Sequence, residues 1–318
     1  MAGDPPIDAM PGGLKAVDAT RITKAVARLS VCTALVLIAL KLWAWWVSDS
    51  VSMFASLADS GLDGMASMFT LLAVSYAAVP PDAEHRFGHG KAEGFAAIAQ
   101  AMFVGVSATL VATEAVGRVR NPEPIVESTL ALAVMAISIA LTLALLWAQS
   151  RAIAKTGSAA TKGDRAHYAA DLASNIAVIG GISLAAFTGL GWADPLVGLG
   201  VAAWLAWSAL SVARSGWDQL LDREASDTVR ERIRDLALSR GVLLEIHDLR
   251  TRTSGPYIHI QFCAALPSHL SLVEAHEAMQ AAHDAILTEF PAADVFIQPD
   301  PRGRAGADDL ELLPTAAE

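Results

Sequence analysis

The sequence predicts a multi-pass α-helical membrane protein, with six transmembrane helices followed by a small cytoplasmic α+β domain. Of the 318 residues, 53% are hydrophobic and only 18% are charged, whereas soluble proteins carry about 25% charged residues. After residue 222 the composition changes to that of a soluble domain, with helix-type and strand-type patterns. The net charge of −10, without a basic stripe, argues against a nucleic-acid partner.

Six apolar segments are each long enough to cross a bilayer, which takes about 20 residues. We place them at 26–47, 52–79, 93–117, 127–149, 167–189 and 194–215. Lysines and arginines favour the N-terminus and the connections after the second and fourth segments, which predicts that both termini are cytoplasmic. Glycines in these segments are expected to allow close helix packing: Gly61, Gly64, Gly180, Gly181, Gly198 and Gly200.

Four regions follow from these patterns. Residues 1–20 are expected to be a disordered cytoplasmic N-terminus, 21–222 the membrane domain, 223–302 the α+β domain and 303–318 a disordered acidic tail. Within the α+β domain, Ser226 and Ser271 are expected to start two helices. The predicted order is helix 227–240, strand 246–252, strand 257–265, helix 271–290 and strand 294–298, a small open αββαβ sandwich.

Two pairs of ionisable residues interrupt the second and fifth apolar segments. Asp59 and Asp63 form one pair, and His167 and Asp171 form the other. On a helix, residues four apart share a face, with side chains about 5–6 Å apart. Ionisable groups in hydrocarbon are costly and usually functional. Three carboxylates and one imidazole make a tetrahedral Zn²⁺ site, although separate polar contacts at helix ends would also account for them.

The chemistry of this quartet suggests a transported ion. Oxygen and nitrogen ligands without cysteine make a labile site that suits Zn²⁺ and the similarly bound Cd²⁺, and tolerates Fe²⁺ and Mn²⁺. An empty site with three ionised carboxylates would hold a charge of −3 in a low dielectric, which drives protonation. Metal binding would then expel protons, so we expect cation movement coupled to opposite proton movement.

A second set of ligand types lies between the second and third segments. Asp82, His85 and His89 are spaced to close around one ion, and Gly88 and Gly90 let the loop fold tightly. A polar, water-exposed loop is the alternative interpretation.

Five motifs follow one another over roughly residues 20–302: Ala58-Asp59-Ser60 with Asp63, Phe87-Gly88-His89-Gly90-Lys91-Ala92-Glu93, His167-Tyr168 with Asp171, Leu220-Leu221-Asp222-Arg223 and His247-Asp248-Leu249-Arg250-Thr251-Arg252. Together, and in this order, they resemble the bacterial zinc and ferrous-iron efflux branch of the cation diffusion facilitator family.

The resemblance implies a homodimeric metal exporter with a metallochaperone-like cytoplasmic domain and no organic cofactor. It implies that the quartet is the transport site, that the Asp82 loop binds metal, and that Lys91 and Asp222 form a salt bridge that locks the subunits together.

The cytoplasmic domain departs from the family pattern. His247, His276 and Asp300 match three positions of the family's paired-metal site, but Gln261 and Gln298 stand at two histidine positions. His259 and His283 are nearby substitutes. A single weaker site and a metal-free dimerisation domain both remain open.

Two other classes of function were weighed. A membrane metalloenzyme would need a second histidine in His276-Glu277-Ala278-Met279-Gln280, which ends in glutamine. A metal sensor or scaffold would not need ligands at mid-membrane depth. We therefore expect a transporter rather than an enzyme.

Overall fold

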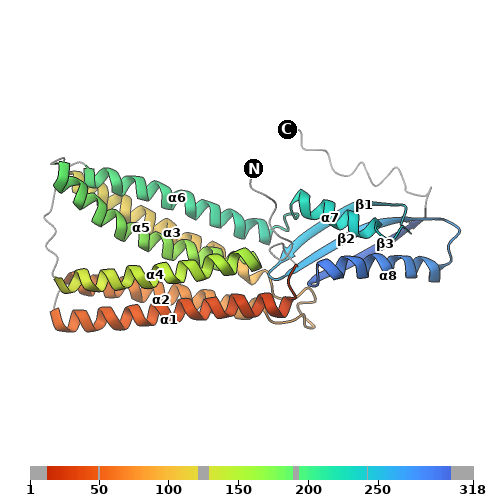
Figure 1. The fold of residues 1–318 in the computed structure, drawn as a ribbon, viewed down its shortest axis with the longest axis horizontal. Helices are drawn as coiled ribbons and strands as arrows, with labels where there is room; N and C mark the ends of the chain where they lie inside the picture. Colours follow the sequence, from red (N-terminus) through yellow and green to blue (C-terminus); the bar gives the residue numbers. More distant parts are fainter. Residues whose placement is uncertain (1–12, 49–50, 121–128, 189–192, 242, 302–318) are drawn as a thin grey trace. The chain divides into compact units, whose positions relative to one another are not determined.

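The computed structural model describes residues 13–48, 51–120, 129–188, 193–241 and 243–301 (Figure 1). It divides into two compact units, a helical unit of residues 17–221 and an α+β unit that begins at residue 222. The predicted disordered ends lie largely outside the described residues, but helix α1 already begins at Ala16, inside the expected N-terminal lead.

The helical unit contains six long helices. They are α1 (Ala16–Ser48), α2 (Val51–Ala77), α3 (Ala92–Arg120), α4 (Thr129–Thr156), α5 (Ala159–Thr188) and α6 (Ala193–Leu220). In the described part of the chain, four stretches are long and apolar enough to cross a membrane: Ala16–Val47, Ala92–Gly117, Ala133–Thr156 and Leu196–Leu220. The prediction of an apolar, multi-pass helical part is confirmed. Helices α2 and α5, which carry the predicted aspartate and histidine ligands, are not among the four.

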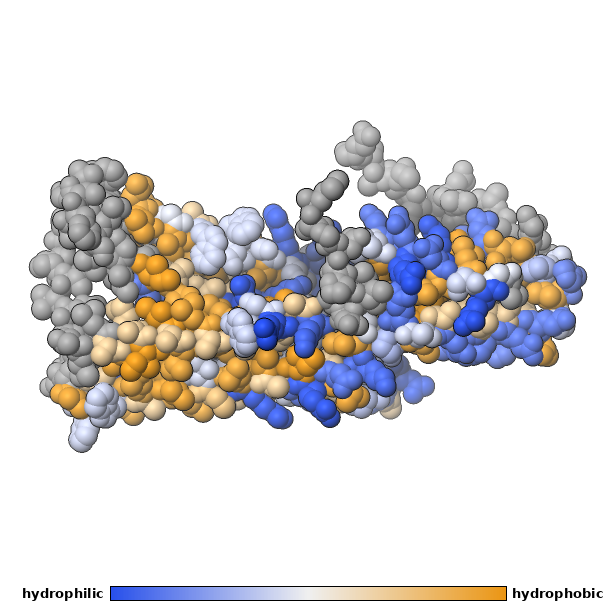
Figure 2. Space-filling view, viewed as in Figure 1, coloured by the Kyte–Doolittle hydropathy of each residue, from blue (hydrophilic) through white to orange (hydrophobic). Residues whose placement is uncertain are grey.

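The surface of the helical unit is the kind that lipid covers. Figure 2 shows that apolar residues dominate its visible face, whereas hydrophilic residues are frequent on the α+β unit. Large side chains such as Leu110 and Trp207 are more than 60% exposed. Water would penalise so much exposed apolar surface, so this exposure fits a bilayer.

The helices form two groups within this unit. Helices α3, α5 and α6 pack against one another, and α1, α2 and α4 lie together (Figure 1). Small residues fill the core of the first group: Ala97, Ala101 and Ala108 on α3, Ala166 and Ala170 on α5, and Ala209 on α6. Helix α5 also contacts α2 and α4, so it belongs to the interface between the groups.

A close contact between two helices lies at glycines that the sequence analysis did not single out. A Cβ at Gly216 on α6 would stand 2.7 Å from the carbonyl oxygen of Gly94 on α3, and 3.0 Å from Cγ1 of Ile98. Of the glycines expected to allow close packing, Gly64 would meet Ile38 at 3.1 Å and Gly198 would meet Ala115 at 3.0 Å, whereas Gly61 and Gly200 have nothing within 4 Å of such a Cβ. Backbone-to-backbone packing thus joins α3 to α6.

The α+β unit has the predicted element order. Its elements are α7 (Asp227–Leu238), β1 (Glu245–Ser254), β2 (Tyr257–Leu266), α8 (Leu272–Glu289) and β3 (Ala293–Pro301). The sheet order is β1-β2-β3, with β1 antiparallel and β3 parallel to β2. Its core is built from the inner face of β2 and from both helices, through Ile233, Ile258, Ile260, Ile286 and Phe290.

The two predicted helix starts differ in detail. Ser271 and Glu274 form a complete capping box at the start of α8. Ser226 precedes α7 as expected, but its side chain makes no capping hydrogen bond.

Replacing Gly216 by alanine is expected to destabilise the helical unit, because the new methyl group meets the α3 backbone, which cannot move aside cheaply. We expect a loss of about 1–3 kcal/mol, measured as a lower thermal unfolding temperature in detergent. The matched control is Gly200→Ala on the same helix, which meets nothing. Equal unfolding temperatures in the two variants would contradict the close contact.

Candidate metal centre

Three of the four predicted transport ligands converge between α2 and α5. One ligand atom each of Asp63, His167 and Asp171 lies within 4.8 Å of the others. His167 Nε2 is 3.0 Å from Asp63 Oδ1 and 3.9 Å from Asp171 Oδ2. Asp63 and His167 are buried. The spacing of four residues within α5 brings two ligands to one face, and the packing of α5 on α2 supplies the third.

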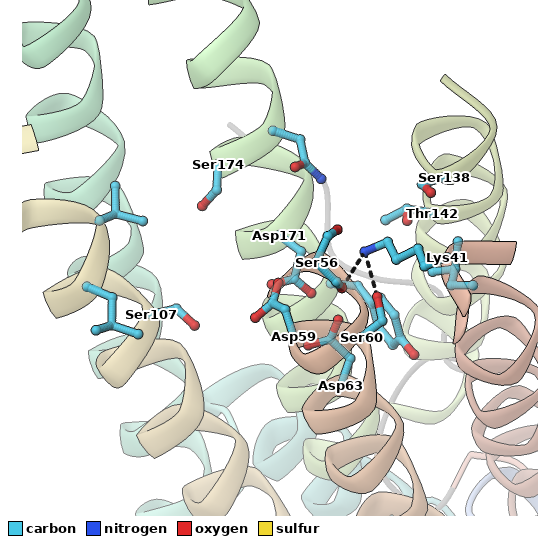
Figure 3. A pocket seen from close by; sticks show the side chains of 15 residues that line it. Lys41, Ser56, Asp59, Ser60, Asp63, Ser107, Ser138, Thr142, Asp171 and Ser174 are labelled. Atoms are coloured by element: carbon cyan, nitrogen blue, oxygen red, sulfur yellow. Dashed lines mark hydrogen bonds between the residues drawn. The ribbon is translucent and has the colours of Figure 1, made fainter. Parts of the chain in front are cut away.

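Asp59 lines the same cavity but does not belong to this cluster among the described residues. It lies one helical turn before Asp63 on α2, and it interacts electrostatically with Asp63 and with Asp171. Figure 3 shows its carboxylate pointing toward Asp171. The cavity has a volume of about 210 Å³ and is lined by α1 to α5, including Ser107, Ser138, Thr142 and Ser174. Polar side chains therefore surround the cluster.

Two atoms of the cluster lack hydrogen-bond partners in the described structure. They are His167 Nδ1 and Asp171 Oδ2, both fully buried. Buried polar atoms are nearly always paired, so an unpaired one calls for an explanation. A cation held by the carboxylates would satisfy Asp171.

A second polar network was missed by sequence reasoning. Asp164, three residues before His167, is only 1% exposed. Its carboxylate accepts hydrogen bonds from Ser30 Oγ at 2.6 Å, from Gln149 Nε2 at 2.8 Å and from Ser67 Oγ at 3.3 Å. Tyr168 joins the same network through Ser67. Four helices, α1, α2, α4 and α5, thus meet at one carboxylate.

The signal for Asp164 lay in its spacing. Residues 164, 167, 168 and 171 follow the helical period on one face of α5. The expected span began at 167, whereas α5 begins at Ala159. Asp164 therefore appeared to lie in a polar connection rather than inside a packed helix.

The loop ligands also come together. One ligand atom each of Asp82, His85 and His89 lies within 4.8 Å of the others. Asp82 is 3.5 Å from a ring nitrogen of each histidine. The backbone N–H of His85 donates to Asp82 Oδ1, and this hydrogen bond holds the pKa of the Asp82 carboxyl below its usual value. The loop thus keeps an ionised carboxylate beside two imidazoles.

The tight loop depends on one glycine. Gly88 has φ +78°, a left-handed conformation that favours glycine, and its N–H donates to the carbonyl of His85. The turn places His89 against Tyr76, with ring centroids 4.6 Å apart.

The predicted salt-bridge residues lie in different units. Lys91 Nζ donates to the carbonyl of Leu220 at 3.2 Å within the helical unit. Asp222 is 3.3 Å from Arg252 within the α+β unit. The pairing of Lys91 with Asp222 stays a prediction.

The α+β unit joins two of its three predicted ligands. His247 Nε2 is 3.2 Å from Asp300 Oδ2, although β1 and β3 are separated by β2. The exposed His276 on α8 is not part of a ligand cluster among the described residues. Cys263 lies between His247 and Gln298 in the strand register, a sulfur atom that the sequence analysis did not consider as a ligand.

The two histidines considered as substitutes, His259 and His283, each contact a different aspartate. His259 hydrogen-bonds to Asp294 at 2.9 Å. It lies four residues from Cys263 along β2, which is about 13 Å of strand. His283 contacts its neighbour Asp284 on α8. Each of these histidines thus contacts an aspartate outside the His247–Asp300 pair.

Comparisons with known proteins agree with this architecture. Residues 27–221 match the model of the cation efflux transmembrane domain, and residues 225–302 match that of the cation efflux protein cytoplasmic domain. The chain belongs to the cation efflux family, which is a family of transporters and not of enzymes.

Relatives extend over nearly the whole chain. The cation-efflux pump FieF of Shewanella oneidensis is 41% identical over 87% of this chain and 94% of its own. FieF of Cronobacter sakazakii is 37% identical, over 89% and 94% of the two chains. A solved structure of CzrB in its zinc form is 30% identical over 27% of this chain and 98% of its own, with a TM-score of 0.25.

Removing the Asp164 carboxylate is expected to destabilise the helical unit, because three donors from three helices lose their acceptor. Each donor keeps a second partner, so the loss is that of the hydrogen bonds to the carboxylate, about 1–3 kcal/mol in total. Asp164→Ala should therefore unfold at a lower temperature than the wild type. Asp164→Asn keeps one acceptor oxygen and should lie between them. An Asp164→Ala protein as stable as the wild type would show that the network does not hold the helices together.

Proposed function

We propose that this chain exports Zn²⁺ from the cytoplasm in exchange for protons, through a tetrahedral site of Asp59, Asp63, His167 and Asp171. The observation that carries the proposal is the buried contact of His167 with Asp63, next to Asp171. Asp59 supplies the fourth ligand from the same cavity. The similarity to cation-efflux pumps supports export of a metal cation.

The contact geometry supports proton exchange. A nitrogen and a carboxylate oxygen 3.0 Å apart share a hydrogen bond, which needs a proton between them. The same two atoms are the natural ligands of Zn²⁺. A metal ion bound there displaces the shared proton, so loading the metal and losing a proton are coupled.

The ligand set favours Zn²⁺, with Cd²⁺ as a close substitute. One nitrogen and three oxygens fit a four-coordinate ion, whereas ions such as Mn²⁺ favour more oxygen ligands. Fe²⁺ and Mn²⁺ are the weaker candidates.

The wider assignment follows the family. We propose six membrane-spanning helices within residues 21–222, both termini in the cytoplasm, an inner-membrane location and a homodimer joined through the domain at 223–302. The match of that domain to the cation efflux cytoplasmic domain supports this orientation. A Lys91–Asp222 salt bridge near the membrane surface would reinforce the dimer.

We propose that Asp82, His85 and His89 bind a second ion. In the α+β unit, the His247–Asp300 pair is the candidate for a single weaker site, with His276 as a possible further ligand. Two ligands bind zinc less tightly than four. We therefore assign transport to the four-ligand site and not to the His247–Asp300 pair.

The test of transport is zinc uptake by proteoliposomes under an imposed pH gradient, with Cd²⁺, Fe²⁺ and Mn²⁺ measured alongside. We expect His167→Ala and Asp63→Ala each to abolish proton-coupled flux, because either change removes one half of the 3.0 Å contact. His283→Ala, which removes a half-buried histidine of α8 in the other unit, is the control and should transport normally. Undiminished flux in both site variants would refute the proposed path.

The loop site is tested by counting bound metal. A protein with both Asp82→Ala and His85→Ala should bind about one zinc ion fewer per chain in equilibrium dialysis, because a lone histidine does not complete a zinc site. Glu84→Ala, which removes a carboxylate from the same loop, should keep the wild-type stoichiometry. An unchanged count in the double variant would exclude zinc from this loop.

A further inference from the structure

A lysine on α1 shares the cavity of the proposed transport site. The ammonium of Lys41 donates hydrogen bonds to Ser60 Oγ at 2.6 Å and to the carbonyl oxygen of Ser56 at 3.2 Å (Figure 3). Residues 56, 59, 60 and 63 lie on one face of α2, because they are spaced by three and four. The positive charge is therefore held on the same helix face as the carboxylates of Asp59 and Asp63.

The position of this charge differs from that of an ordinary interfacial lysine. Lysines near the ends of membrane helices extend their side chains toward water and headgroups. Lys41 instead turns toward α2 and lines the cavity together with Asp59, Asp63 and Asp171. It interacts electrostatically with all three carboxylates. Its side chain thus belongs to the charge balance of the site.

We propose that Lys41 is an internal counter-ion of the transport site, which stabilises the carboxylates without metal and repels the metal ion once it is bound. This inference rests on the proposed function of the site. A transporter must bind its ion strongly enough to load it and weakly enough to release it. Two cations near the same three carboxylates, in a medium of low dielectric, repel each other strongly. Lys41 would therefore weaken zinc binding and speed release.

The cavity geometry makes the idea testable without unfolding the protein. In a Lys41→Met variant, the methionine side chain is similar in length to lysine and fills the same space. The substitution also removes a charge from an apolar helix. The hydroxyl of Ser60, which is 1% exposed, can then bond the carbonyl of Ser56 four residues earlier. The substitution leaves no buried hydroxyl without a partner.

The experiment measures the zinc dependence of the initial flux into proteoliposomes. We expect KM and the maximal rate of Lys41→Met each to fall by roughly tenfold. KM falls because zinc binds more tightly once the repelling charge is gone, and the maximal rate falls because tightly bound zinc leaves the site more slowly. Lys41→Arg keeps the positive charge, so its KM and maximal rate should lie close to the wild-type values. Lys24→Met, which removes a lysine of the same helix that does not line the cavity, is the matched control and should behave as the wild type.

The outcomes separate this inference from the proposed function. A Lys41→Met protein with an unchanged or raised KM would overturn the counter-ion role, even if its maximal rate fell, because a structural defect lowers the rate without tightening binding. If Lys41→Met has the wild-type KM and maximal rate while Asp63→Ala is inactive, the proposed transport site is supported and only the counter-ion role of Lys41 is rejected. If Asp63→Ala still transports zinc, the assignment of the transport site itself is wrong.

Discussion

The helical unit depends on one constraint: polar side chains inside apolar helices must find partners in other helices. The contact between His167 on α5 and Asp63 on α2 meets this requirement at 3.0 Å. Because both residues are buried, their contact fixes which faces of α5 and α2 meet. Asp164 continues the same stripe of α5 by one turn and binds α1, α2 and α4. Lys41 ties α1 to α2 on the other side of the site. The candidate site therefore lies between two further sets of polar contacts, those of Asp164 and those of Lys41, along the interface of these helices.

The other helix contacts have a different origin. Helices α3 and α6 approach through Gly94 and Gly216 and through small side chains, which let the two helices pack closely. Helix α5 takes part in both kinds of contact, since its alanines pack on α3 and its polar residues face α2. A movement of α5 would change the ligand geometry at once, because His167 and Asp171 both lie on it. This arrangement makes α5 the element through which a change in helix packing would reach the metal.

The sequence was sufficient for features that are encoded locally. Spacing by four residues predicted that His167 and Asp171 share one face of α5, and alternation and helix-start serines predicted the order of the α+β unit. Ser271 starts α8 as expected, where a capping box also forms. It was insufficient where the partner is distant in the chain. Asp164 meets Ser30 across 134 residues, and Lys41 meets Ser60 across 19. No local period marks such pairs. The close contact of Gly216 was missed for the same reason, because the glycine it meets lies on another helix.

The two units differ in what they offer a cation. The helical unit concentrates carboxylates around one imidazole, and the nearby loop adds Asp82 with two histidines. The α+β unit, in its described part, brings His247 only to Asp300, with glutamines where the family resemblance implies histidines. Charged ligands bind divalent cations far more strongly than amides do, because the attraction grows with ligand charge. We therefore propose that the helical unit and its loop, rather than the α+β unit, provide the stronger cation sites of this chain.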